Sequence, residues 1–219
     1  MPVLFLDLDG TLVDRDAAVR RWAEEVVAAR GLHPSVVEQV LAADGGGHRP
    51  KPEVAADLTR LLQLSVNESE TIITDLRAGV VKHLAPAAGV EEGLARARRA
   101  GWTLVIVSNG ATSQQQAKLD KTGFGDLVDG VVISEAVGVE KPDPRIFQIA
   151  IDLVPGQDLD GAWHVGDSAE ADVQGAHNAG IRSIYLRHGR GWTPGIAEPT
   201  AFADSFGEAV DIALADRAR

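Results

Sequence analysis

Five short runs of apolar, mostly β-branched residues recur along this sequence, and longer stretches with helical spacing separate most of them. The runs occupy residues 3–6, 103–107, 131–133, 162–165 and 183–186. Because they lack polar alternation, they suit strands that are buried on both faces, as in a parallel sheet. The helical stretches cover residues 90–100, 113–121, 144–154 and 169–179, and glycines stand at three expected C-caps: Gly101, Gly123 and Gly180. This repetition predicts an α/β fold, a right-handed, doubly wound parallel sheet with a Rossmann-like core.

One stretch interrupts the alternation, because residues 16–84 carry only helical signals. An apolar stripe ends at Gly31, and further helices are expected over residues 35–43, 53–64 and 70–84. Ser65 and Glu68 have the spacing of a capping box. We therefore predict an inserted all-helical cap domain over residues 16–85, within an α/β core domain made of residues 1–15 and 86–219.

Composition narrows the classes of function that this chain can serve. Its 219 residues contain no cysteine, which excludes disulfides, zinc–thiolate sites and thiol catalysis. A net charge of −11 disfavours binding to nucleic acid or to an anionic membrane. No basic leader or membrane-spanning run is recognisable. We expect a cytoplasmic protein with a small-molecule partner, and the oligomeric state stays open.

Polar clusters follow four of the predicted strands, at the point where each strand ends. The residues concerned are Asp7 and Asp9, Ser108 and Asn109, Lys141, and Asp167 with Asp172. Each cluster alone is explained as a turn, a helix cap or surface decoration. The carboxyl ends of parallel strands meet at one edge of a sheet, however, and ligands bind there. Acids suit Mg²⁺, and a hydroxyl, an amide and an ammonium suit phosphoryl oxygens, so the joint pattern indicates phosphoryl transfer.

These residues resemble the motifs of the haloacid dehalogenase-like hydrolase superfamily, in the branch that carries a helical cap. The first motif matches Asp7-Leu8-Asp9-Gly10-Thr11, and the other three match Ser108, Lys141, and Gly166-Asp167 with Asp172. The order and spacing of the motifs also fit, and the resemblance extends over essentially the whole chain.

The resemblance implies a role for each site residue. It makes Asp7 the nucleophile and Asp9 the general acid and base. It assigns Mg²⁺ to Asp7, the main-chain carbonyl of Asp9 and Asp167, with Asp172 supporting the metal. It places Thr11, which orients the first motif, among the substrate-binding residues together with Ser108, Asn109 and Lys141. A carboxylate nucleophile is expected to be ionised at neutral pH without a base to activate it.

Asp9 also separates two activities within the superfamily, because the similar dehalogenases lack an acid at this position. The sequence therefore favours a phosphatase: a Mg²⁺-dependent phosphomonoester hydrolase that acts on a small phosphorylated metabolite through an aspartyl-phosphate intermediate. Two alternatives stay open. A phosphomutase or phosphotransferase would use the same intermediate, and a catalytically silent phosphate-binding module would not need Asp9.

Three further features receive plainer interpretations. The basic segment around His48, Arg49 and Lys51 is interpreted as a flexible linker, although it has the charge to meet an anionic substrate. The loop over residues 187–192 is interpreted as surface. His164 lies within an apolar run, so we expect it to be packed in the core.

Overall fold

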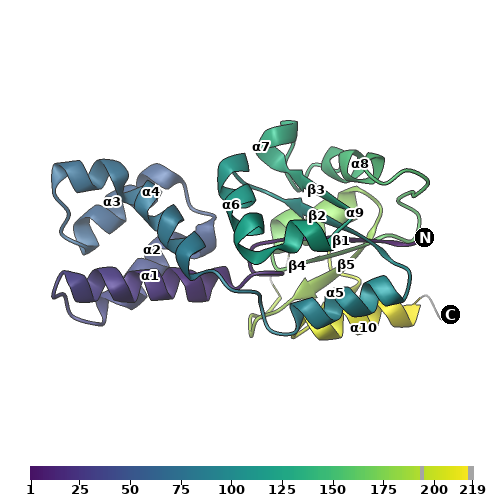
Figure 1. Ribbon diagram of the computed structural model, residues 1–219, viewed down its shortest axis with the longest axis horizontal. Coiled ribbons are helices and arrows are strands. Elements are labelled where there is room, and N and C mark those ends of the chain that lie inside the picture. The colour runs from purple at the N-terminus through teal and green to yellow at the C-terminus, as the bar shows by residue number, and fades with distance from the viewer. Residues whose placement is uncertain (193–194, 217–219) are drawn as a thin grey trace. The chain divides into compact units, whose positions relative to one another are not determined.

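The computed structural model describes residues 1–192 and 195–216. The chain divides into two compact units, one made of Met1–Val13 and Pro86–Arg219 and the other of Asp14–Ala85. The first unit is the α/β unit and the second is the helical unit (Figure 1).

The α/β unit is built on a six-stranded sheet in the order β3-β2-β1-β4-β5-β6, in which all pairs are parallel. The strands are β1 (Val3–Leu6), β2 (Thr103–Ser108), β3 (Gly130–Ile133), β4 (Trp163–Gly166), β5 (Arg182–Leu186) and β6 (Ala201–Ala203). The central strand β1 pairs with β2 through Leu4 and Leu104, and with β4 through Leu4 and Trp163. The predicted doubly wound parallel sheet is confirmed, and the strand order reverses at β1.

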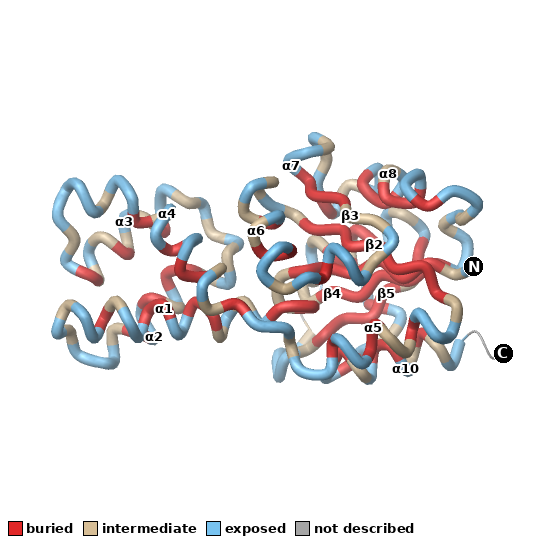
Figure 2. The backbone as a smooth tube through the Cα atoms, viewed as in Figure 1, coloured by how far each residue is buried: buried red, intermediate tan, exposed pale blue. Residues whose placement is uncertain are grey.

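Helices cover both faces of this sheet. They are α5 (Val90–Arg99), α6 (Thr112–Thr122), α7 (Ser134–Val137), α8 (Arg145–Asp152), α9 (Gln174–Asn178) and α10 (Phe206–Asp216), with a 3₁₀ turn over Phe124–Leu127. Figure 1 shows α5 and α10 side by side on one face and α8 on the other. Figure 2 shows that the strands between these layers are buried. Phe5 and Val105 pack with Phe147 and Ala150 of α8 in this core.

Three parts of the α/β unit differ from the sequence prediction. The helix expected over residues 169–179 is divided into a π-helical turn, Ala169–Val173, and α9. The Asp172 carboxylate accepts the Ser168 N–H at 2.8 Å across this wide turn, which aims the side chain back at the strand ends. The short edge strand β6 was not anticipated, because three residues are too few to show a period. The helix α10 was not anticipated either.

The helical unit contains α1 (Arg15–Ala29), α2 (Val36–Asp44), α3 (Lys51–Leu61) and α4 (Val66–His83), with a 3₁₀ turn over Gly45–Gly47. Gly79 of α4 faces the Trp22 ring so closely that a Cβ there would lie 2.0 Å from the ring. The predicted capping box is present, because Ser65 and Glu68 exchange side-chain and backbone hydrogen bonds at the start of α4.

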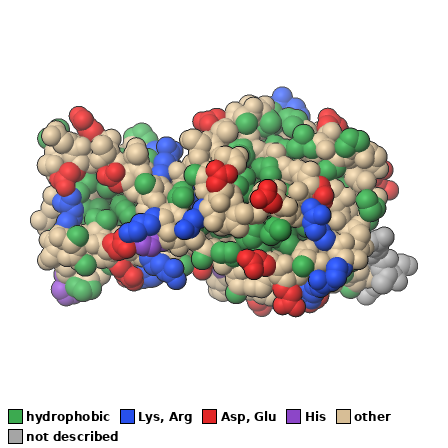
Figure 3. Space-filling view, in the orientation of Figure 1, with side chains coloured by type: hydrophobic (Ala, Val, Ile, Leu, Met, Phe, Trp, Pro, Cys, Tyr) green, Lys and Arg blue, Asp and Glu red, His purple; other side chains and the backbone are tan. Residues whose placement is uncertain are grey.

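Two observations concern the charge of the surface and the length of the helices. Acidic and basic side chains are interspersed over the face drawn in Figure 3. Among the described residues, no helix is both long enough and apolar enough to cross a membrane.

Candidate active site

The ends of β1 and β4 bring the acidic residues of the first and fourth motifs together. Asp7 follows β1 directly, and its N–H donates to the Val165 carbonyl of β4 at 2.9 Å. Gly10 has a φ of 76°, and a Cβ there would lie 2.5 Å from Asp167 Oδ2. Gly166 is equally constrained, since a Cβ would lie 2.2 Å from the Asp172 carboxyl carbon. Only glycine at both positions lets these two carboxylates approach the backbone so closely.

Lys141 occupies the centre of the site. Its buried ammonium group donates to Asp7 Oδ1 at 2.8 Å, to Asp172 Oδ1 at 2.7 Å and to the Val107 carbonyl at 2.7 Å. An ammonium group has three N–H donors, so all of them are engaged. Lys141 therefore joins the nucleophile candidate to the fourth motif, and it balances part of the negative charge that the acids bring.

The two carboxylates that share Lys141 differ in their titration. Burial raises the pKa of Asp7 to about 8, and the charges of Asp172 and Asp167 add to this effect. Asp172 is also buried, but Lys141 and His164 lower its pKa below the ordinary value. Without a bound cation, burial thus favours the protonated form of Asp7. The expectation of an ionised nucleophile did not include the cost of burying the charge, which a bound cation would offset.

Three acids form a cluster with the composition of a metal site. Asp7, Asp167 and Asp172 each offer one carboxylate oxygen to this cluster, and these three oxygens lie within 4.8 Å of one another. Burial raises the pKa of Asp167 as well. A divalent cation would offset the repulsion that raises these pKa values, and hard carboxylate oxygens are the ligands that Mg²⁺ prefers. The residues present therefore fit the ion that the sequence predicts.

His164 supports Asp172 from below the site. The ring is fully buried on β4, its Nε2 lies 2.9 Å from Asp172 Oδ1, and it stacks edge-on against Phe147. Burial lowers the pKa of His164, so the ring is neutral and donates from Nε2 to the ionised carboxylate. His164 is packed in the core as predicted, but the sequence pattern did not reveal this bond to Asp172.

The remaining site residues of the first and second motifs are also placed. The Asn109 side chain bonds to both backbone groups of Lys141, donating to its carbonyl at 2.8 Å and accepting its N–H at 2.9 Å. This side chain holds the Lys141 loop, and its role towards a phosphate stays a prediction. Thr11 is buried, and its hydroxyl has no hydrogen-bond partner among the described residues.

Sequence reasoning missed two buried residues of α6, Gln115 and Lys118. The Gln115 amide donates to Ser108 Oγ at 2.6 Å and to Asp9 Oδ2 at 3.0 Å. Lys118 Nζ lies 2.5 Å from the same Asp9 oxygen. The available signal was their spacing of three residues near the start of a helix that follows the second motif, which puts both side chains on one face close to the strand ends.

The loop after β5 is largely exposed, as expected, and two of its side chains also contact the first and fourth motifs. His188 Nε2 lies 2.6 Å from the Gly10 carbonyl, and the Arg190 guanidinium donates to Asp167 Oδ2 at 2.8 Å. The basic segment of the helical unit is tied to its own unit instead. Arg49 donates to the Ala43 carbonyl at 2.7 Å and to Asp57 at 2.9 Å, and Lys51 donates to the Gly47 carbonyl at 2.8 Å.

Comparison with known proteins agrees with this geometry. The family model of haloacid dehalogenase-like hydrolases matches residues 1–180, which include all four motifs. The chain belongs to this family. Solved structures related to this hydrolase have the same fold: the HAD-hydrolase YfnB of Bacillus subtilis, whose crystal structure contains magnesium, superposes with a TM-score of 0.83. At 20% identity, that match covers 97% of this chain and 98% of the other.

Curated relatives of this hydrolase are phosphatases. The phosphoglycolate phosphatase of Agrobacterium fabrum is 30% identical over 209 residues, which cover 94% of this chain and 89% of that enzyme. The pyrimidine 5'-nucleotidase YjjG of Escherichia coli is 40% identical over 116 residues, a match that spans about half of each protein, 52% and 51%. The chain is accordingly a hydrolase of the phosphatase class.

Proposed function

We propose that this phosphatase is a Mg²⁺-dependent phosphomonoester hydrolase that forms an aspartyl-phosphate on Asp7 and acts on a small phosphorylated metabolite. The observation that carries the proposal is the arrangement around Asp7. A buried carboxylate lies beside a lysine, inside a cluster of acids that fits a divalent cation, and a second carboxylate, Asp9, follows two residues later.

Asp7 and Asp167 would hold the ion through their carboxylates, together with the main-chain carbonyl of Asp9. Both oxygens of Asp172 already accept hydrogen bonds, from Lys141 and His164 on Oδ1 and from the Ser168 N–H on Oδ2. Asp172 therefore supports the metal site indirectly, by fixing Lys141 and the start of the π-helical turn. When bound, the ion supplies positive charge that keeps Asp7 ionised and stabilises the transferring phosphoryl group.

In the first chemical step, a carboxylate oxygen of Asp7 attacks phosphorus and the bond from phosphorus to the ester oxygen breaks. Asp9 gives its proton to that leaving oxygen, so the alcohol departs neutral. In the second step, Asp9 takes a proton from water while the water oxygen attacks the phosphorus of the aspartyl-phosphate. The acyl phosphate bond breaks, inorganic phosphate leaves, and the Asp7 carboxylate is restored. Lys141, Ser108 and Thr11 would contact the phosphoryl oxygens, as the resemblance to the family motifs implies.

The test compares Asp7→Asn with Asp9→Asn on an alkyl phosphate and on p-nitrophenyl phosphate. Asp7→Asn should abolish turnover of both substrates. Mass spectrometry should detect phosphorylated protein in the wild type and none in this variant. Asp9→Asn should lower kcat on the alkyl phosphate by about 10²- to 10⁴-fold. It should lower kcat much less on the aryl phosphate, because nitrophenolate leaves without needing a proton. Equal losses for both variants on both substrates would show that this division of labour is wrong.

The substrate itself is best sought among the classes named by the relatives. These are pyrimidine nucleotides, phosphoglycolate, phosphoserine and glyceraldehyde 3-phosphate. A screen of such monoesters with Mg²⁺, read out as released phosphate, would identify the best substrate. Formation of an isomeric phosphate ester without free phosphate would instead indicate a phosphomutase.

A further inference from the structure

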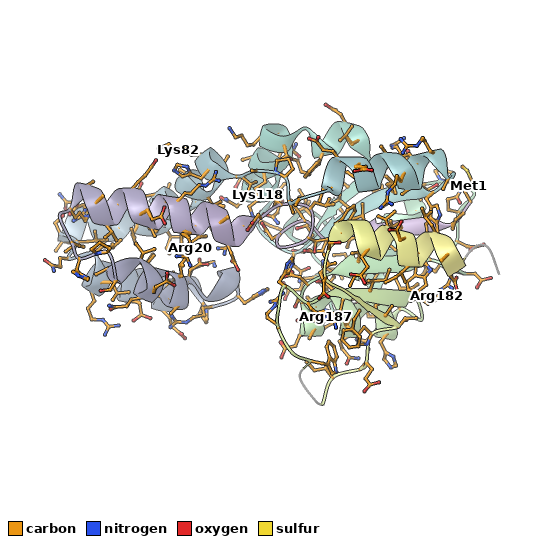
Figure 4. The ribbon with its side chains drawn as sticks, turned by 90° about the horizontal axis from the view of Figure 1, so that it is seen from below. Met1, Arg20, Lys82, Lys118, Arg182 and Arg187 are labelled. Carbon is orange, nitrogen blue, oxygen red and sulfur yellow. The ribbon has the colours of Figure 1, made fainter. Side chains whose placement is uncertain are left out.

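Helix α6 carries two polar side chains on its buried face, Gln115 and Lys118. Their exposed fractions are 2% and 3%, lower than lysine in particular tolerates without a partner. The residues are three apart, so their side chains lie on the same face of the helix. Figure 4 labels Lys118 among the side chains of the structure. A glutamine and a lysine buried together in this way need a reason beyond packing.

Both side chains converge on one atom. Lys118 Nζ lies 2.5 Å from Asp9 Oδ2, and Gln115 Nε2 lies 3.0 Å from the same oxygen. The Gln115 amide nitrogen also donates to Ser108 Oγ at 2.6 Å and to the Asn109 carbonyl at 3.3 Å. Through Gln115, the first motif is therefore tied to the second, and through Lys118 the Asp9 carboxylate is paired with a buried cation.

These contacts fix the carboxylate in a way that matters for proton transfer. The terminal torsion of an aspartate is broad, so the group turns easily unless its oxygens are held. Ammonium and amide nitrogens only donate hydrogen bonds. Because Oδ2 accepts from both, a proton on Asp9 belongs on Oδ1. The pair thus determines which oxygen exchanges the proton and in which direction it points.

We propose that Lys118 and Gln115 are positioning residues for Asp9, which orient its carboxylate for proton transfer to the leaving group and from water. This inference rests on the proposed function, in which Asp9 is the general acid and base. The competing explanation is an ion pair that only stabilises the fold. It predicts that the variants lose stability. It also predicts that any loss of activity in the folded fraction is the same for both leaving groups.

The test uses Lys118→Met and Gln115→Leu, which remove the donors but keep similar volumes. The matched control is Lys121→Met, because Lys121 is an exposed lysine on the same helix. Each variant is assayed with Mg²⁺ on an alkyl phosphate and on p-nitrophenyl phosphate, after circular dichroism has verified the folded fraction. We expect kcat on the alkyl phosphate to fall about 10- to 100-fold for Lys118→Met, a part of the full general-acid effect. The loss on p-nitrophenyl phosphate should stay below about 3-fold, and Lys121→Met should match the wild type.

The double variant Asp9→Asn with Lys118→Met separates the two proposals. If Lys118 acts through Asp9, the double variant loses no more activity than Asp9→Asn alone. Suppose that Asp9→Asn loses more activity on the alkyl phosphate than on the aryl phosphate, as proposed. The positioning role alone is then overturned if Lys118→Met and Gln115→Leu lose equal activity on both substrates. It is also overturned if the losses multiply in the double variant. If Asp9→Asn itself shows no dependence on the leaving group, the assigned role of Asp9 fails, and the positioning role fails with it. Should Lys118→Met not fold, the same comparison with Gln115→Leu decides the matter.

Discussion

Replacing the nucleophile candidate should make the metal-free protein more stable, not less. Asp7 is buried beside Asp172 and Asp167, and its pKa is raised from 3.8 to about 8. In the Asp7→Asn variant an amide of the same shape occupies this position, and its oxygen can still accept the bond from Lys141. The variant therefore removes the cost of ionising Asp7 while it keeps most of the contacts.

The sign and size follow from proton linkage. Between pH 3.8 and about 8 the unfolded chain has released the Asp7 proton while the folded protein retains it. The unfolded state then binds fewer protons at this residue, so the contribution of Asp7 to wild-type stability falls with rising pH by about 1.4 kcal/mol per pH unit in this window. Asp7→Asn has no such term. By pH 7 its advantage should have grown by about 4 kcal/mol relative to pH 4, and it should level off above pH 8.

The assay is urea unfolding in excess chelator at several pH values from 4 to 9. Asp160→Asn serves as a control, because it removes one negative charge from an exposed position. Saturating Mg²⁺ should narrow the difference between wild type and Asp7→Asn, since a bound cation favours the ionised carboxylate. A difference in unfolding free energy that stays constant with pH, or that is the same for Asp160→Asn, would refute the reasoning.

Three further outcomes are expected. A chelator should abolish turnover, and added Mg²⁺ should restore it. Ca²⁺ should not restore turnover, because its coordination shell is larger and more flexible; released phosphate measures turnover in each case. His164→Phe removes the bond to Asp172 Oδ1 and should weaken Mg²⁺ binding about 10-fold or more in calorimetry. An unchanged affinity would mean that His164 serves packing only. Gly10→Ala would place a Cβ 2.5 Å from Asp167 Oδ2 at a positive φ, so it should lose most Mg²⁺ affinity and activity. Wild-type binding in that variant would contradict the close approach that we describe.

Sequence reasoning reached the parts of the site that depend on strand ends. Asp7 directly follows β1, Lys141 lies in the segment after β3 and α7, and Asp172 lies in the π-helical turn after β4. These residues are far apart in the chain, and the structure joins them through hydrogen bonds. Parallel strand ends converge whatever the details of packing, so motif spacing was sufficient.

The parts that sequence reasoning missed depend on side-chain direction. Nothing in the spacing shows that the Asn109 amide turns to the Lys141 backbone, or that Lys118 turns inward to Asp9. The raised pKa of Asp7 was missed for a related reason, because burial of a carboxylate follows from three-dimensional packing and from the acids that surround it. Such features follow only from the three-dimensional arrangement of the side chains.

The register of β1 has a consequence for how this protein is made. The strand is synthesised before its partners, which are residues 103–106 of β2 and residues 163–165 of β4. The helices of Asp14–Ala85 pack on one another and need nothing synthesised later to find their neighbours. Since domains form as units during synthesis, the helical unit can assemble while the strand that precedes it still waits for its partners. The segment that carries the proposed nucleophile is thus synthesised before the helical unit but paired in the sheet after it.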